Sequence, residues 1–358
     1  MLDKLALTDL SYDEMLAWVE GQGEPTFRAQ QLFAWIYRSL AHDFADMKNL
    51  PTAFRQKLAE TAFIQSLTPL ESSTSADALT VKTLFELSDG ETIEAVLMRY
   101  EGRQTVCVST QVGCAIGCPF CATGQSGFRR NLSSGEIVAQ VLHFARQLQS
   151  QGKAVTNLVF MGMGEPLANY EATWQAIRVL NDARGMGLGA RRFTISTAGL
   201  VPGIRRMTSE NLAVGLAVSL HAPSDALRNR LVPVNKRYPI AELIESCRAY
   251  AQSSGRRVTF EYALIEGLND ERAQARELAE ILGDLLCHVN LIPVNPTAEC
   301  EYRPSSRQRV MAFHRELTGL GIGNTIRLER GVDIQAGCGQ LRSRRLSRQN
   351  PHQDQKGS

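Results

Sequence analysis

Short apolar segments alternate with amphipathic segments from about residue 92 onward, and this alternation constrains the fold more than any other feature of the chain. Continuous apolar runs are typical of strands that are buried on both faces of a parallel sheet, and the amphipathic segments between them are typical of helices that cover such a sheet. The alternation therefore predicts an α/β fold. The expected strands span 93–100, 104–110, 155–160, 192–196, 212–220, 258–264, 289–294 and 325–328.

The number of expected strands decides which kind of barrel the chain can form. Six strands between residues 104 and 294 are too few for a closed eight-stranded barrel, so a partial (βα)6 barrel fits best. One helix should open at Ser133, because Ser133-Ser134-Gly135-Glu136 has the form of a capping box, and it should run to about residue 149. The other expected helices cover 170–181, 270–283 and 305–320, and one more begins near 239.

The chain of 358 residues, 44% of them hydrophobic, is long enough for a catalytic domain and a smaller appendage. Residues 1–65 are expected to form a helical accessory domain, which is either a packing appendage or a partner-binding domain. Residues 66–91 are rich in Ser and Thr and should form a connector with short strands. The core domain should span 92–340, and the polar, Arg-rich tail 341–358 should be disordered.

Three cysteines lie close together directly after the second expected strand, in a Cys-x3-Cys-x2-Cys array formed by Cys114, Cys118 and Cys121. Thiolate sulfur favours iron–sulfur clusters or zinc. A structural zinc site takes four ligands, usually from two separated pairs, whereas three cysteines without a nearby fourth ligand indicate a [4Fe–4S] cluster with one open iron. A zinc loop and buried free thiols are the alternatives.

Polar and glycine residues follow the other expected strands of the barrel. Ligands of such barrels collect at the carboxyl ends of the strands. Carboxylate, hydroxyl and amide groups together suit a zwitterionic amino acid joined to a ribose. The strand ends carry Met161-Gly162-Met163-Gly164-Glu165-Pro166, Ser196-Thr197-Ala198-Gly199, Ser219-Leu220-His221 and Asn295.

Two further cysteines stand apart from the array. Cys107 lies in the strand that leads to the cysteine loop, and Cys338 lies between two glycines in Gly337-Cys338-Gly339. A thiol flanked by glycines can be approached by a bulky reactant, and a thiolate is a strong nucleophile. These two residues are therefore candidate catalytic groups, and incidental thiols are the alternative.

The charge distribution bears on the partner. The formal net charge is only +2, but the arginines are clustered. One cluster alone is usually a solvated surface, whereas five on a near-neutral protein favour a local basic surface and a polyanionic partner. The clusters are Arg129-Arg130, Arg191-Arg192, Arg205-Arg206, Arg256-Arg257, and the set Arg303, Arg307 and Arg309.

The start of the chain shows no signal peptide, and no apolar run approaches the roughly 20 residues that a membrane span needs. We therefore expect a cytoplasmic protein without membrane contact. In the reducing cytosol, clustered cysteines indicate a metal or catalysis rather than structural disulfides.

The cysteine spacing, with Phe120 before the last cysteine, resembles the signature of the radical S-adenosylmethionine (SAM) enzymes. With three more motifs, the chain is similar to the radical SAM rRNA adenine methyltransferases, and most similar to the dual-specificity branch that methylates carbon 2 of an adenine in 23S rRNA and in some tRNAs. The similarity covers nearly the whole chain and ends near residue 341. The motifs are Gly162-Met163-Gly164-Glu165-Pro166, Ser219-Leu220-His221-Ala222-Pro223 and Asp333-Ile334-Gln335-Ala336-Gly337-Cys338-Gly339-Gln340.

The resemblance implies a radical mechanism, because carbon 2 of adenine is electron-poor and cannot attack the methyl group of SAM. One SAM methylates Cys338, and a second SAM yields a 5′-deoxyadenosyl radical that removes a hydrogen atom from that methyl. The carbon radical adds to the base, a general base matching Glu94 removes the ring proton, and Cys107 attacks Cys338 to form a disulfide and release the product. From the residues alone, Glu94 could equally be a solvated strand residue.

The resemblance also implies a [4Fe–4S] cluster on Cys114, Cys118 and Cys121. The residues that match the SAM contacts of the family are Gly164, Glu165, Ser196, Ser219, Leu220, His221 and Asn295. It implies 23S rRNA and tRNA as substrates and an external electron donor such as flavodoxin or ferredoxin. We further expect a monomer.

Three other functions remain open from the sequence. One is the sister activity on carbon 8 of adenine, which uses the same cysteines. Another is a radical SAM reaction on a peptide or small molecule, which leaves Cys107 and Cys338 without a role. The third is a non-catalytic iron–sulfur or zinc RNA-binding protein, which gives no reason for the segment 162–166.

Overall fold

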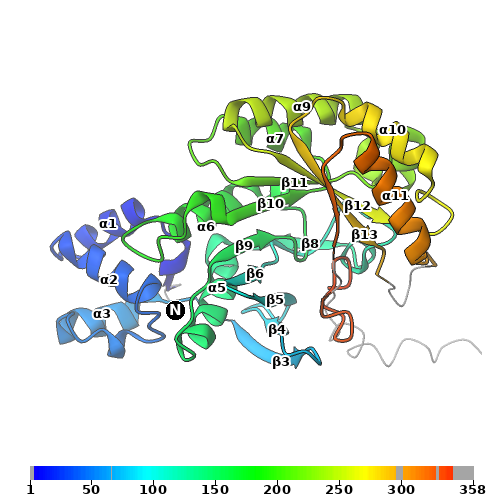
Figure 1. The fold of residues 1–358 in the computed structure, drawn as a ribbon. Coiled ribbons are helices and arrows are strands. Elements are labelled where there is room, and N and C mark those ends of the chain that lie inside the picture. Colours follow the sequence, from blue (N-terminus) through cyan, green and yellow to red (C-terminus); the bar gives the residue numbers. More distant parts are fainter. Residues whose placement is uncertain (1–3, 66, 296–300, 328–329, 342–358) are drawn as a thin grey trace, which may run out of the picture.

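A ten-stranded sheet forms the centre of the computed structural model, which describes residues 4–65, 67–295, 301–327 and 330–341 (Figure 1). Its strand order is β14-β13-β12-β11-β10-β9-β6-β5-β4-β3. Neighbouring strands from β6 to β14 are parallel. They are β6 (Arg103–Cys107), β9 (Asn157–Phe160), β10 (Phe193–Thr197), β11 (Gly215–Ser219), β12 (Val258–Leu264), β13 (Cys287–Pro293) and β14 (Asn324–Ile326).

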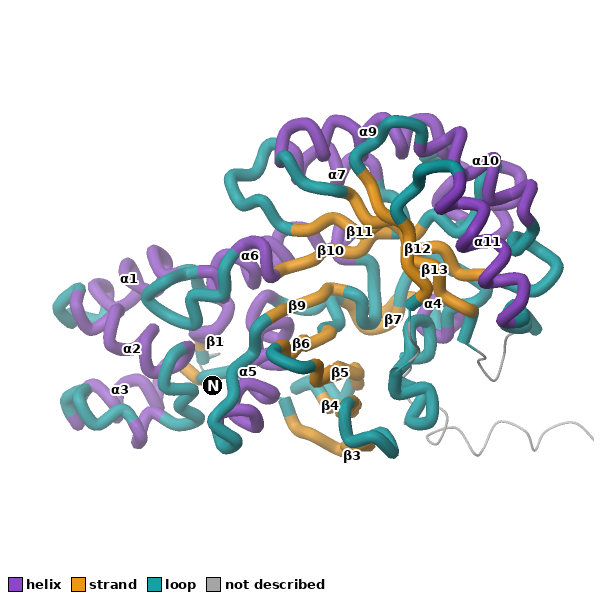
Figure 2. Tube along the Cα trace, viewed as in Figure 1, coloured by secondary structure: helices purple, strands orange, loops and turns teal. Residues whose placement is uncertain are grey.

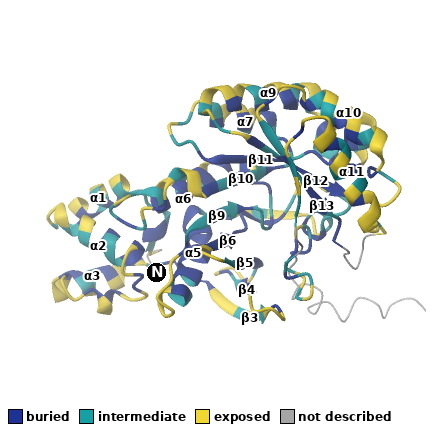
Figure 3. Ribbon diagram, viewed as in Figure 1, coloured by how far each residue is buried: buried dark blue, intermediate teal, exposed yellow. Residues whose placement is uncertain are grey.

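Helices lie on the outer side of the curved parallel strands (Figure 2). Their buried faces join one continuous apolar core with the strands, as Figure 3 shows by the dark inner and pale outer sides. The partial α/β barrel expected from the sequence is thus confirmed. The helices are α5 (Ser134–Gln149), α6 (Tyr170–Asn181), α7 (Val201–Thr208), α8 (Asp225–Leu231), α9 (Ile240–Ser254), α10 (Arg272–Leu282) and α11 (Arg307–Gly319).

The predicted capping box at the start of α5 is confirmed. The Ser133 hydroxyl accepts a hydrogen bond from the backbone N–H of Glu136 at 3.1 Å, and the Glu136 carboxylate accepts one from the Ser133 N–H at 2.9 Å. These two bonds satisfy donors that a helix start leaves unpaired. The short helices α7 and α8 were not predicted, because two turns are too few for an apolar period to stand out.

An antiparallel unit extends the sheet beyond β6. It consists of β3 (Thr68–Thr74), β4 (Thr80–Glu86) and β5 (Thr92–Tyr100), with β5 paired to β6. The region expected as a connector with short strands therefore supplies two strands, β3 and β4, of the central sheet. The strand β4 lies between β3 and β5 in the sheet, and all of its residues but the last are buried, so it is an integral part of the fold.

The N-terminal region contains α1 (Tyr12–Gly21), α2 (Phe27–Tyr37) and α3 (Thr52–Thr61), with β1 (Leu5–Ala6) paired to β2 (Ala62–Phe63). It packs on the side of the barrel beside α5 and α6 (Figure 1). The Asp9 carboxylate accepts hydrogen bonds from the Gly135 N–H and the Ser134 hydroxyl at the start of α5. Phe33 and Tyr37 leave no room for a side chain at Gly185, where a Cβ would lie 2.7 and 2.8 Å from their atoms.

A small hairpin of β7 (Gln111–Gly113) and β8 (Phe128–Asn131) closes the base of the cysteine loop. Gly113 has φ +75°, and a Cβ there would lie 1.8 Å from the carbonyl oxygen of Gly127, so this crossing requires glycine. Inside the loop, α4 (Ala122–Gln125) follows the third cysteine.

None of the helices in the described ranges is both long and apolar enough to cross a bilayer. The tail expected to be disordered lies outside the described residues except for Leu341, which is buried.

Candidate active site

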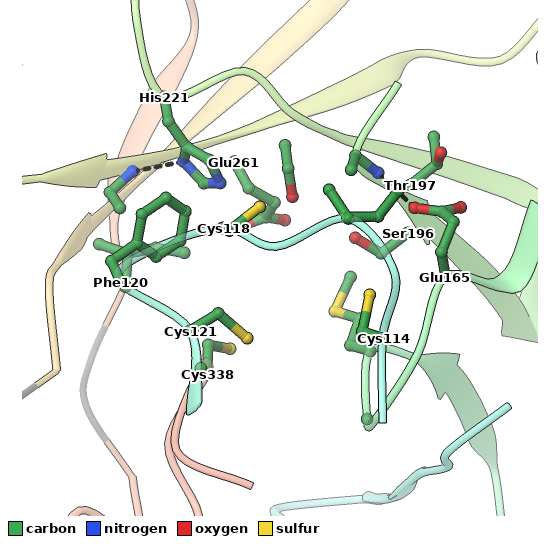
Figure 4. A pocket seen from close by; sticks show the side chains of 18 of the residues that line it. Cys114, Cys118, Phe120, Cys121, Glu165, Ser196, Thr197, His221, Glu261 and Cys338 are labelled. Carbon is green, nitrogen blue, oxygen red and sulfur yellow. Dashed lines mark hydrogen bonds between the residues drawn. The ribbon is translucent and has the colours of Figure 1, made fainter. Parts of the chain in front are cut away.

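A cavity opens at the carboxyl ends of the parallel strands, and Figure 4 shows the side chains that line it. All three cysteines of the loop contribute to its wall, as do Gly164, Glu165, Ser196, Ser219, His221, Asn295 and Cys338. The strand ends, the cysteine loop and the segment 330–341 therefore bring together ten of the thirteen residues predicted as site residues. Leu220, Cys107 and Glu94 are not part of the wall.

The three loop cysteines face the cavity from two sides. Cys114 lies near Glu165, and Cys118 and Cys121 lie across from it (Figure 4). Burial raises the pKa of Cys114 to about 12, and burial likewise raises the pKa of Cys118 and of Cys121. As the thiols stand, no group of three His, Cys, Asp or Glu side chains in the described ranges is arranged to hold a metal ion.

The donor set nevertheless fits an iron–sulfur cluster. Three soft sulfur atoms border one cavity, and a positively charged iron centre would reverse the effect of burial by favouring thiolate. A second observation points to a bound ligand. Asn295 lines the cavity and is 7% exposed, and its buried Oδ1 atom has no hydrogen-bond partner among the described residues. A buried acceptor of this kind is costly unless a ligand donates to it.

Glu165 is held by the backbone around it. Its two carboxylate oxygens accept hydrogen bonds from the N–H groups of Ala198, at 2.7 Å, and Leu167, at 3.0 Å. Burial raises its pKa to about 7. Gly164, directly before it, has φ +100°, and a Cβ there would lie 2.6 Å from Cβ of Gln111. The turn thus needs glycine to bring Glu165 to the wall.

His221 has a defined protonation pattern. Its Nδ1 atom accepts a hydrogen bond from the Ala263 N–H at 2.9 Å, which leaves the proton of the neutral ring on Nε2. Burial lowers its pKa to about 3, so the ring is neutral near pH 7. Phe120 of the cysteine loop packs edge-on against this ring, with 5.0 Å between the ring centroids. Leu220, one residue earlier, is fully buried and contributes its backbone to the strand end instead of lining the cavity.

Cys338 lies beside the cysteine loop and is exposed. The carbonyl of Cys338 accepts a hydrogen bond from Asn295 Nδ2 at 3.1 Å. The carbonyl of the next residue, Gly339, accepts one from the Ala122 N–H at 2.8 Å. Cys107 ends β6 close by. Burial raises the pKa of Cys107 to about 12, and the neighbouring Cys338 thiol raises it further. Both cysteines are free thiols here.

Glu94 lies behind the loop that carries Cys338. It is 2% exposed, and its carboxylate forms an ion pair with Lys82 at 3.1 Å. The Lys82 ammonium also donates to the carbonyl of Gln335, at 3.1 Å, three residues before Cys338. The interpretation of Glu94 as a solvated strand residue is therefore wrong, because the side chain is buried in the sheet.

Two charged residues of the wall were not predicted. Glu261 lies in the middle of β12, and Arg327 follows β14, with 3.7 Å between them. The Cys338 thiol is the main influence that raises the pKa of Arg327. A carboxylate inside an otherwise apolar strand was the available signal for Glu261, whereas nothing in the sequence distinguishes Arg327 from other arginines.

Most of the arginine clusters have carboxylate partners. Arg130 bonds to both Asp89 and Glu136, and Arg206 bonds to Glu171. Arg129, Arg205 and Arg309 form ion pairs with Glu91, Glu242 and Asp270, at 2.7, 3.0 and 2.6 Å. These charges are partly neutralised within the protein, so the basic surface is weaker than the sequence suggested.

The barrel and its cysteine-lined cavity define a radical SAM enzyme. Residues 108–279 match the model of the radical SAM superfamily, and residues 5–64 match that of the ribosomal RNA large subunit methyltransferase N-terminal domain. The chain belongs to the RlmN family of radical SAM RNA methyltransferases.

Its relatives match over nearly their full length. A probable dual-specificity RNA methyltransferase RlmN of Chloroflexus aurantiacus is 49% identical, covering 96% of this chain and 94% of the relative. The corresponding protein of Geobacillus kaustophilus is 46% identical, covering 95% and 93%. The crystal structure of a radical SAM methyltransferase from Sphaerobacter thermophilus superposes with a TM-score of 0.92 at 53% identity, covering 94% of this chain and 99% of that one.

Proposed function

We propose that the protein methylates carbon 2 of an adenine in 23S rRNA, and also in tRNA, through a methyl group carried on Cys338. The observation that carries the proposal is the position of Cys338 in the wall of the cavity lined by Cys114, Cys118 and Cys121. A radical SAM reaction that did not use this thiol would give no reason for its place there. The names of the relatives, dual-specificity RNA methyltransferases, support an RNA substrate.

The three loop cysteines would hold the [4Fe–4S] cluster, and the strand-end residues with Asn295 would hold SAM. When bound, the reduced cluster and SAM supply a carbon radical that can remove a hydrogen atom from a methyl group. All other roles belong to side chains of this chain. The Cys338 side chain, which is exposed at the wall of the cavity, presents the methyl carbon to the adenine.

Glu94 and Cys107 are the two other residues with a proposed catalytic role. The Glu94 carboxylate accepts the proton of the adenine ring carbon, and this requires the adenine to enter the site from the side of β5. The radical adduct would return its surplus electron to the cluster. The Cys107 thiolate then attacks the Cys338 sulfur, so that a disulfide forms and the carbon–sulfur bond of Cys338 breaks. The electron pair of that bond stays on the carbon, which takes up a proton to become the methyl group of the released base. The proximity of Cys107 to Cys338 supports this pairing.

The N-terminal helices and the arginine clusters are the proposed phosphate-binding surface. The target adenine has to be unstacked or already in a loop, because a ring carbon is inaccessible inside a duplex. Binding of RNA should weaken steeply as the salt concentration rises, and a flat salt dependence would count against this surface. A cytoplasmic location, an external reductant of the flavodoxin or ferredoxin kind and a monomeric state stay predictions.

The test is anaerobic reconstitution of the protein with iron and sulfide, followed by SAM, dithionite and an unmodified 23S rRNA fragment. The RNA is digested and analysed by mass spectrometry against standards of 2-methyladenosine and 8-methyladenosine. We expect the 2-methyl isomer. The 8-methyl isomer would overturn the assignment of carbon 2, and SAM cleavage without RNA methylation would point to a different substrate.

A further inference from the structure

Arg228 is a fully buried arginine directly behind the cavity. It lies in α8, and its guanidinium donates four hydrogen bonds. Three go to backbone carbonyls at the ends of neighbouring strands: Ala198 at 2.7 Å, Ser219 at 2.9 Å and Leu220 at 3.1 Å. The fourth goes to the side-chain oxygen of Asn235 at 2.7 Å. The guanidinium therefore ties together the backbone that follows β10 and β11.

The charge of Arg228 has no direct carboxylate partner. Among the described residues, no Asp or Glu oxygen lies within 4.0 Å of its nitrogens. Asp225 is reached only through the amide of Asn235, which donates to it at 2.8 Å. Burial lowers the pKa of Arg228 to about 10, which still leaves it protonated near pH 7. A buried cation with only dipoles around it is unfavourable unless an anion compensates for it.

The cysteine loop is the place from which an anion could compensate for the charge of Arg228. Cys118 and Phe120 of the cysteine loop pack against the same small apolar cluster as Leu227 and Leu231, which flank Arg228 on α8. Two of the carbonyls that Arg228 binds belong to Ala198 and Ser219, and these residues share the cavity wall with Cys118. Of the groups that act on Arg228 electrostatically, Cys118 is the one that most favours its charged form.

We propose that Arg228 is a positioning residue that supplies the positive counter-charge for the thiolates of Cys114, Cys118 and Cys121, and that it thereby raises the reduction potential of the cluster they hold. This inference rests on the proposed function, since it needs a cluster at the three cysteines. Three thiolates leave such a site with negative charge, and reduction adds one more electron. A fixed cation in a water-poor environment stabilises the more negative, reduced form by the larger amount.

The experiment measures the reduction potential of the reconstituted cluster by spectroscopically monitored redox titration, without substrate. Four variants are compared with the wild type. The R228Q variant removes the positive charge. The R228K variant keeps the charge but replaces the planar guanidinium group with an ammonium group. The double variant D225N/N235D exchanges the amide and the carboxylate, so that a carboxylate bonds to the intact Arg228 while the net charge is unchanged. R248Q, at a half-buried arginine paired with Asp284, is the matched control.

We expect R228Q and D225N/N235D to shift the potential to more negative values, and R228K and R248Q to stay close to the wild type. A structural role alone would not produce this order, because the double variant keeps every donor of Arg228. If R228Q does not fold, the double variant decides the question. Potentials of R228Q and of the double variant within the range of R248Q would overturn the inference. A wild type that takes up no [4Fe–4S] cluster would overturn the proposed function and the inference with it.

Discussion

The two sides of the cavity are built by different means. The strand side consists of Gly164, Glu165, Ser196, Ser219 and His221, which stand at the ends of paired strands. The loop side consists of residues 330–341 and carries Cys338. Strand pairing in the sheet holds the first side, whereas a few single contacts hold the second, such as Lys82 to the Gln335 carbonyl and Thr123 to the Leu341 carbonyl.

This difference matches the two tasks of the proposed reaction. A cofactor site benefits from a fixed geometry, because preorganised polar groups need no rearrangement when the ligand binds. A thiol that accepts a methyl group, presents it to a base and then forms a disulfide has to change partners. We therefore expect substitutions on the loop side to affect the transfer of the methyl group, and substitutions on the strand side to affect stability and SAM binding.

The largest effect should follow from Cys338→Ala, which removes the methyl carrier. RNA methylation should fall to background, whereas the free energy of unfolding should change by less than about 0.5 kcal/mol, because the side chain is exposed. Mass spectrometry of the RNA and urea unfolding measure the two quantities. Cys287→Ala, at a half-buried thiol outside the cavity wall, is the control and should retain methylation. Turnover by the Cys338 variant would refute the methyl-cysteine route.

Glu94→Gln should slow methyl transfer by about 10²- to 10⁴-fold, which is the usual contribution of a general base. Methylation of Cys338 itself should persist, because no ring proton is involved at that stage. Single-turnover rates report the first quantity and intact-protein mass spectrometry the second. Glu71→Gln is the matched control, because Glu71 borders the same small cavity as Glu94 and is exposed. Equal rates in the two variants would remove Glu94 from the mechanism.

On the strand side, Gly164→Ala should lower the free energy of unfolding by about 2–5 kcal/mol. The positive φ contributes roughly 1–2 kcal/mol, and the overlap of the new Cβ with Gln111 contributes roughly 1–3 kcal/mol. Gly187→Ala isolates the first term, because φ is +64° there and the nearest atom lies 3.7 Å from the new Cβ. Urea unfolding of both variants separates the terms. If the Gly164 variant lost no more free energy of unfolding than the Gly187 variant, the turn would be able to move away from Gln111.

The smallest effect concerns the contact between the N-terminal helices and the barrel. Asp9→Ala removes the acceptor for the Gly135 N–H and should cost about 1 kcal/mol, as the loss of a helix cap does. Thermal unfolding against Glu20→Ala, an exposed residue of α1, provides the comparison. If the Asp9 variant were as stable as the Glu20 variant, the apolar contacts around Gly185 alone would hold the N-terminal region in place.

Some features of the fold were beyond prediction from the sequence because they depend on distant partners. Residues 66–91 have the composition of a connector with short strands, yet β4 is a central strand of the sheet, and Phe85 is buried because it packs against His143 and Phe144 of α5. The arginine pairs looked like a basic surface, but the fold brings Glu91, Glu171 and Glu242 to them from other elements. A charge pattern along one chain does not show which opposite charges come near it in space.

The succession of the parallel strands along the chain, and the polar and glycine residues at their ends, could be predicted from the sequence alone, because apolar runs of strand length and the glycine turns after them are local signals. Only the tertiary structure decided that Cys338 lies beside Cys121 and Cys107, and that Arg228 stands behind Cys118. These contacts join residues far apart in the chain through single hydrogen bonds and shared packing, which leave no periodic trace in the sequence.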